Sequence, residues 1–127
     1  MAIIRLMDES DATGKVKALF EEIKTTLQIP FVPELFRALA WKPERLEAVW
    51  TRVKGLYGSG SLDVKTKLLA ALAVAAVQRN AYFVKIHAIA LKRFGASDEE
   101  ILELLDLAGF SAEHDTLVSG LDLEPEL

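Results

Sequence analysis

His87 is the residue whose type and setting most invite a chemical interpretation. It lies in the stretch RNAYFVKIHAIALKRFGASDEEI, residues 79–101, and is one of only two histidines in the sequence. Imidazole often transfers protons near neutral pH and often binds metals. No carboxylate, cysteine or second histidine lies within four positions of His87. Three roles stay open: a packed core or interface residue, one wall of a ligand pocket, or a general base.

Metal, thiol and phosphate chemistry have little support. The second histidine, His114, is far away in the sequence, and no Asp or Glu lies at helical spacing from His87, so we expect no metal site and no cofactor. The chain has no cysteine, which excludes disulfides and thiol reactions. The segment YGSGS, residues 57–61, lacks the lysine that follows the glycines of a phosphate-binding loop.

Length and composition predict one globular domain over residues 1–127. Hydrophobic residues make up 51% of the 127, which is enough for a core and hints at further surface buried between subunits. The net charge is −4 without a basic patch, so we expect no nucleic-acid partner. The longest apolar run, LLAALAVAAV at residues 68–77, is too short to cross a bilayer. The absence of a signal-peptide pattern and of cysteine favours a cytoplasmic location.

Helical periodicity dominates the chain and predicts the elements that position His87. Prolines and loop residues separate the first periodic segments, which predict helices over residues 14–27, 33–40, 43–56 and 63–79. The first and third of these helices each carry an apolar stripe. The stripe of the first contains Val16, Leu19, Phe20, Ile23 and Leu27. The stripe of the third contains Leu46, Val49, Trp50, Val53 and Leu56. The helix over residues 63–79 is apolar on all faces, which is typical of a central helix.

The helix that carries His87 is bounded by residues suited to its two ends. Asn80 is a favourable N-cap and Gly95 a favourable left-handed residue after the last turn. Ser97 and Glu100 form a capping box for the next helix, which we expect to end at Gly109. Ser111 then caps a last short helix to about residue 119. The fold class is therefore all-α, with six or seven helices and no strands.

Five side chains share one face of the His87 helix: Asn80, Phe83, His87, Ala90 and Phe94. We expect Phe83 and Phe94 to lie in the core and Asn80 to act as a cap. A buried imidazole needs a hydrogen-bond acceptor, so the fold should supply one near His87. Tyr82 either packs in the core or lies at the edge of a cleft.

The segment resembles the core motif of the alkylhydroperoxidase D (AhpD)-like and carboxymuconolactone decarboxylase family. The peroxidase branch carries Cys-x-Tyr-Cys-x-x-x-His at a helix start, then Ala-Leu, a Gly and a Ser-x-Glu-Glu-Ile box. This sequence has NAYFVKIH at residues 80–87, then Ala90-Leu91, Gly95 and SDEEI at residues 97–101. The stretch ATGKVKALFEEIKTTLQIPFVPELFRALAWKP, residues 12–43, resembles the amino-terminal half of the family.

The departures from the motif concern its reactive groups. The two cysteine positions fall on Asn80 and Phe83, and the position of the family's proton-relay glutamate falls on Leu68. The resemblance therefore implies the family fold, and we expect no thiol peroxidase activity. The decarboxylase branch keeps a histidine with nearby carboxylates, which Phe83 and Leu68 also do not supply.

The resemblance implies a homo-oligomer, since family members assemble as dimers, trimers or hexamers. Two further hypotheses accompany the expected peroxidase-related membership. The protein is a non-enzymatic binding or scaffold protein with a pocket for a small apolar or aromatic ligand, lined by Asn80, Tyr82, Phe83 and Leu68 near His87. Alternatively, it is a decarboxylase-like lyase that uses His87 as its base.

Overall fold

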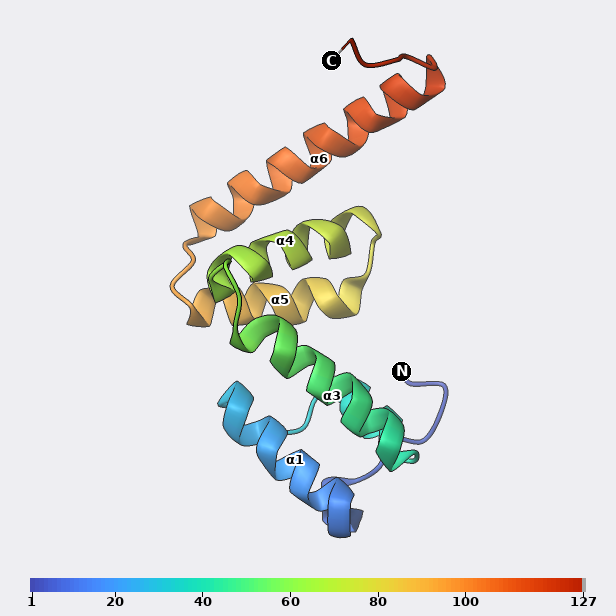
Figure 1. Ribbon diagram of the computed structural model, residues 1–127, viewed down its shortest axis with the longest axis vertical. Coiled ribbons are helices and arrows are strands. Elements are labelled where there is room, and N and C mark those ends of the chain that lie inside the picture. The colour runs from blue at the N-terminus through green and yellow to red at the C-terminus, as the bar shows by residue number, and fades with distance from the viewer. Residues whose placement is uncertain (127) are drawn as a thin grey trace. The chain divides into compact units, whose positions relative to one another are not determined.

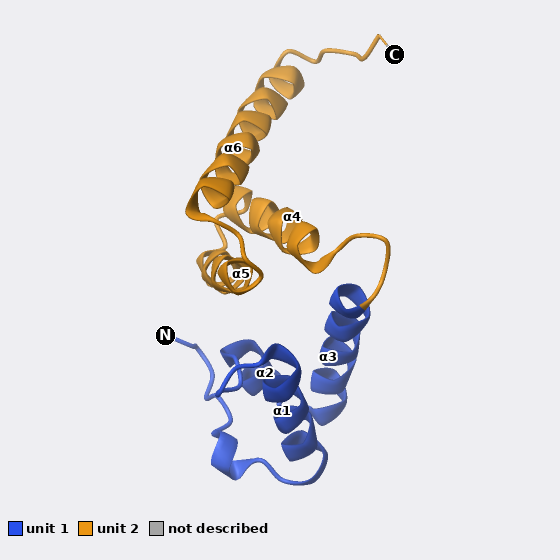
Figure 2. Cartoon of the chain, turned by 90° about the vertical axis from the view of Figure 1, so that its left-hand side faces the viewer, with its two compact units in different colours: residues 1–58 blue, residues 59–127 orange. Residues whose placement is uncertain are grey.

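The computed structural model describes residues 1–126 and is all-helical (Figure 1). These residues form six α-helices and one short 3-10 helix, with no strand among them. The predicted class, all-α with six or seven helices, is therefore confirmed. The chain divides into two compact units, Met1–Gly58 and the residues from Ser59 onward (Figure 2). The assignment of residues 1–127 to one domain stays a prediction.

The first unit packs three α-helices around one buried tryptophan. Its elements are η1 (Glu9–Asp11), α1 (Gly14–Leu27), α2 (Glu34–Leu39) and α3 (Pro43–Gly58). Trp50 of α3 is fully buried, and the ring of Phe36 meets it edge-on with centroids 5.6 Å apart. The predicted stripe of α1 buries Val16, Leu19, Phe20 and Ile23. The periodicity of the sequence thus decides which face of each helix is inside.

The second unit consists of α4 (Val64–Val77), α5 (Ala81–Arg93) and α6 (Asp98–Gly120). Helix α4 packs against both α5 and α6 and buries Leu68, Leu72 and Ala75. The prediction that this apolar helix is central is therefore confirmed within its unit. Asp63 caps its start, since its carboxylate accepts a 2.7 Å hydrogen bond from the backbone N–H of Thr66.

Helix α6 corrects the prediction of two short helices. It runs without a break from Asp98 to Gly120, so Gly109 and Ser111 lie inside it (Figure 1). Glycine in a helix costs only about 1 kcal/mol relative to alanine, and the leucine- and glutamate-rich residues around it favour the helix. The capping box at the start of α6 is confirmed, because Ser97 and Glu100 bond reciprocally to each other's backbone N–H at 3.1 Å.

Three apolar residues assigned to buried positions are exposed. Leu27 and Leu56 lie in the last turns of α1 and α3, and Phe94 is the residue after α5. At Phe94 the backbone angles leave the helical range, and Gly95 follows it with a φ of +85°. The backbone N–H of Phe94 still donates to the carbonyl of Ala90 at 3.1 Å, so Phe94 keeps the helical position, but the chain leaves the α5 axis directly after it and its ring lies exposed at the end of the helix.

Candidate functional site

The site begins at the corner between α4 and α5, which Asn80 shapes. The backbone N–H of Asn80 donates to the carbonyl of Ala75 at 2.8 Å, and Arg79 adopts a left-handed φ of 57°. The Asn80 side-chain oxygen accepts from the backbone N–H of Phe83 at 3.1 Å. The residue at this motif position is therefore held in a structural role as the N-cap of α5.

Phe83 and His87 form a stacked pair one helical turn apart on α5. Their ring centroids are 5.3 Å apart and their planes are 13° from parallel. The ring of Tyr82 packs edge-on against the ring of Phe83, with their centroids 5.3 Å apart. The structure thus brings three of the predicted site residues together, in a small aromatic row at the start of α5.

His87 is half-buried, and its Nδ1 atom has no hydrogen-bond partner. The expectation that the fold supplies an acceptor is wrong for Nδ1 among the described residues, because the residues of α5 around it are apolar. An unsatisfied buried polar atom costs about 1–3 kcal/mol. Burial alone lowers the pKa of His87, since no charged group takes part in the shift. The imidazole is therefore neutral at pH 7.

Leu68 lies in the core of the second unit, on α4, with 5% of its surface exposed. It brings an apolar side chain to the position where the resemblance implies a proton-relay glutamate. No acidic residue occurs anywhere from residue 64 to residue 97, so neither α4 nor α5 offers a carboxylate. The elements that carry His87 can supply apolar contact, stacking and one neutral imidazole, but no proton relay through a carboxylate.

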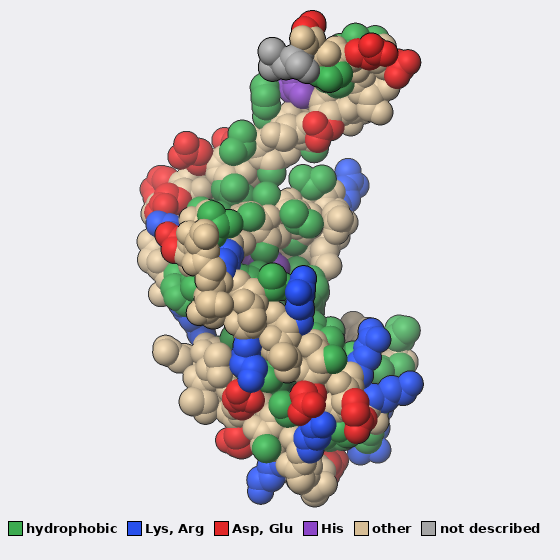
Figure 3. Space-filling model, in the orientation of Figure 1, with side chains coloured by type: hydrophobic (Ala, Val, Ile, Leu, Met, Phe, Trp, Pro, Cys, Tyr) green, Lys and Arg blue, Asp and Glu red, His purple; other side chains and the backbone are tan. Residues whose placement is uncertain are grey.

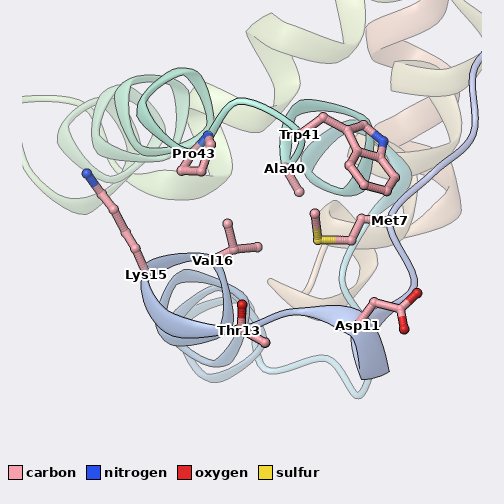
Figure 4. Close-up of a pocket in the computed structure, with 8 residues that line it drawn as sticks. All are labelled: Met7, Asp11, Thr13, Lys15, Val16, Ala40, Trp41 and Pro43. Carbon is pink, nitrogen blue, oxygen red and sulfur yellow. The ribbon is translucent and has the colours of Figure 1, made fainter.

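Two hollows lie on the first unit, and neither includes His87. One, of about 260 Å³, has Met7 and Val16 pointing into the space between the start of α1 and the end of α2 (Figure 4). Lys15 at its edge pairs with Glu47 at 3.1 Å. The other, of about 390 Å³, follows α3 and is lined by Arg45, Ala48, Val49, Arg52 and Val53. The sequence predicted neither hollow.

The pocket predicted from Asn80, Tyr82, Phe83 and Leu68 stays a prediction. In residues 1–126 there is no group of three His, Asp or Glu side chains that could hold a metal ion. No helix in the same residues is long and apolar enough to cross a membrane.

Comparison with known proteins agrees with the motif. The family model described as the carboxymuconolactone decarboxylase family matches residues 43–122, which include α3, α4, α5 and α6. A solved structure, the alkylhydroperoxidase AhpD core from Rhodospirillum rubrum, has a TM-score of 0.92 at 31% sequence identity, over 99% of this chain and 95% of that one.

A second relative is much longer than this chain. The (R)-2-haloacid dehalogenase of Pseudomonas putida is 33% identical over 72 residues, which are 53% of this chain and 24% of that protein. The chain therefore spans about a quarter of that relative's length. The family match and the AhpD core structure confirm the resemblance first seen in residues 80–101. This chain, which lacks the paired cysteines of the peroxidase motif, belongs to the carboxymuconolactone decarboxylase family.

Proposed function

We propose that this protein binds a small apolar or aromatic ligand beside His87 and has no thiol peroxidase activity. The observation that carries the proposal is the stacking of Phe83 on His87 at 5.3 Å, at a position where the family's peroxidase motif has a thiol. A phenyl ring cannot attack a peroxide, and the chain contains no cysteine that could do so. The same ring gives an aromatic ligand a stacking surface.

The chemistry of the His87 surroundings supports a mostly apolar ligand that carries one polar group. Burial lowers the pKa of His87, so the ring is neutral and can take part in one hydrogen bond with a ligand. Nδ1 is buried without a hydrogen-bond partner, so the proposal assigns the contact with the ligand to Nε2. Small lactones and aromatic acids fit this combination of an apolar surface and one polar atom.

Peroxide consumption tests the negative half of the proposal. Purified protein with tert-butyl hydroperoxide and a thiol reductant is expected to consume peroxide no faster than buffer. Consumption above the buffer rate that grows with protein concentration would overturn this half.

Ligand binding tests the positive half. Small aromatic acids, lactones and 2-halo acids serve as probes, the last because a relative is named a 2-haloacid dehalogenase. At least one class is expected to raise the melting temperature of the wild type and of His114→Gln, but not of His87→Gln. An equal rise in both variants would place binding elsewhere, and no rise with any class would contradict a pocket.

A lyase that uses His87 as its base is a second candidate. It is favoured by the lowered pKa of His87, because the unprotonated imidazole is the form that accepts a proton. Turnover of a lactone should then fall by about 10²–10⁴-fold in His87→Gln, which is the usual contribution of a positioned base. Turnover that persists in this variant would remove His87 from the reaction.

The proposal also includes a cytoplasmic homo-oligomer. The absence of cysteine supports the location, and the exposed apolar side chains support the assembly. A dimer, a trimer and a hexamer are all compatible with these observations.

A further inference from the structure

Charge is segregated along the second unit. From residue 64 to residue 97 there are six Lys or Arg residues and no Asp or Glu, whereas from residue 98 to residue 126 there are ten Asp or Glu residues and no Lys or Arg. Helices α4 and α5 are therefore basic, and α6 with the following segment is acidic. Two ion pairs join the basic segment to the acidic one: Lys65 with Glu100 at 2.7 Å and Lys92 with Asp98 at 3.2 Å.

The second half of α6 has an apolar seam that no described residue of the second unit covers. Leu107, Phe110, Leu117 and Leu121 are all more than half exposed, and they follow one another at intervals of three, seven and four residues. His114 fills the gap and stacks on Phe110 with ring centroids 4.0 Å apart. We call these five residues the α6 seam. Alternating three- and four-residue spacing is the pattern by which a helix packs against another helix.

Acidic residues lie between the seam residues in the sequence, and Figure 3 shows both hydrophobic and acidic side chains along α6. Asp106, Glu113 and Asp115 form no ion pair among the described residues. Pairing of the seam with the same seam of a second copy would therefore place acid against acid, which costs free energy in a helix interface. The seam needs a basic helical surface with exposed apolar residues.

The chain itself carries such a surface where α4 meets α5. Val74 and Val77 are more than half exposed in the last turns of α4. Arg79 follows in the connection and Lys85 lies in the first turns of α5, and neither forms an ion pair among the described residues. We call these four residues the α4–α5 corner. It offers two apolar side chains and two unpaired cations to a partner.

We propose that the α6 seam of one copy docks on the α4–α5 corner of a second copy. This contact specifies the surface used by the homo-oligomer of the proposed function and rests on that assembly. Both surfaces belong to the same chain, so the contact is reciprocal in a dimer and repeats around a closed ring. Apolar contact along the seam supplies affinity, and the opposite charges fix the register and exclude seam-on-seam pairing.

Paired charge reversals test this contact by analytical ultracentrifugation at about 0.1 M salt, where exposed charges still interact over about 10 Å. The seam variant is Glu113→Lys with Asp115→Lys, and the corner variant is Arg79→Glu with Lys85→Glu. Each variant alone is expected to raise the dissociation constant at least tenfold. A single chain that carries all four reversals is expected to recover wild-type assembly, because every contact between its copies again joins opposite charges, whatever the number of subunits.

A matched control separates local from general effects of charge. Glu34→Lys with Glu44→Lys makes the same charge change as the seam variant on the exposed starts of α2 and α3, and should assemble like the wild type. Circular dichroism should give wild-type helix content for every variant. A wild type that stays monomeric overturns both the homo-oligomer and this contact. A wild-type oligomer that both variants retain, or a combined four-substitution variant that fails to assemble, overturns this contact alone.

Discussion

His87 and Phe83 lie one turn apart on α5, and their rings stack with centroids 5.3 Å apart. The stacking partner is apolar, the Nδ1 atom has no hydrogen-bond partner, and burial is the cause of the lowered pKa. At the scale of the residue, Asn80 and Phe83 stand at the two cysteine positions of the peroxidase motif. Tyr82, Phe83 and the neutral ring of His87 form an aromatic row there. The aromatic row supports the proposed ligand contact, and it contains no thiol.

The pH dependence of stability follows from the state of His87. Its pKa is lowered in the folded protein and keeps its ordinary value near 6.5 in the unfolded chain, so the unfolded state binds the proton more readily. The stability due to the neutral ring is therefore fully present above pH 6.5 and falls as the pH drops towards the lowered folded pKa. We expect His87→Gln to be less sensitive than the wild type to a change from pH 7.5 to pH 5.5.

Urea unfolding at the two pH values measures this difference, with His114→Gln as the matched loss of an imidazole. The loss of stability on acidification should shrink in His87→Gln and stay at the wild-type value in His114→Gln. An equal loss in the wild type and in His87→Gln would mean that His87 titrates alike in both states.

At the scale of the element, hydrogen-bonded caps decide where the helices of the second unit begin. Replacing Ser97 by Ala removes the capping box of α6 and is expected to lower the free energy of unfolding by about 1 kcal/mol. Ser111→Ala is the control, because Ser111 lies in the interior of α6, where alanine is the better helix former. Thermal or urea unfolding measures both, and a comparable loss from Ser111→Ala would indicate a second helix start there.

Two glycines provide a similar test of backbone geometry. Gly109 is inside α6, and an added Cβ would meet no atom within 4 Å, so Gly109→Ala should stabilise the protein by about 0.5–1 kcal/mol. Gly95 has the same free space but a φ of +85°, so Gly95→Ala should destabilise it by about 1 kcal/mol or more. Equal effects of the two substitutions in urea unfolding would contradict the assigned backbone conformations.

The sequence predicts the helices better than it predicts their surroundings. The bounds of α1 and the caps at Asn80 and Ser97 follow from local chemistry, because a cap bonds within its own first turn. The length of α6 was mispredicted because a glycine is tolerated inside a helix when no proline follows it. The missing partner of His87 Nδ1 and the exposure of Phe94 depend on which segments pack nearby, which periodicity does not specify.

At the scale of the whole molecule, exposed apolar side chains and separated charge lead to one expectation about assembly. Screening shortens the range of charge interactions from about 10 Å at 0.1 M salt to about 3 Å at 1 M. If opposite charges hold the register of the α6 seam on the α4–α5 corner, the association of the wild type should weaken as salt rises. Sedimentation at 0.05, 0.15 and 0.5 M sodium chloride measures this, and association that tightens steadily with salt would favour a purely apolar contact.

An NMR pH titration of the two imidazoles, assigned with His87→Gln, tests the central claim most directly. We expect the His87 signal to stay that of a neutral ring below pH 6.5 and to shift when a small aromatic acid or lactone is added, while the His114 signal does not respond to the ligand. A His87 signal that ignores every probe, and that changes only when the protein unfolds, would contradict a ligand site and make His87 a packing residue.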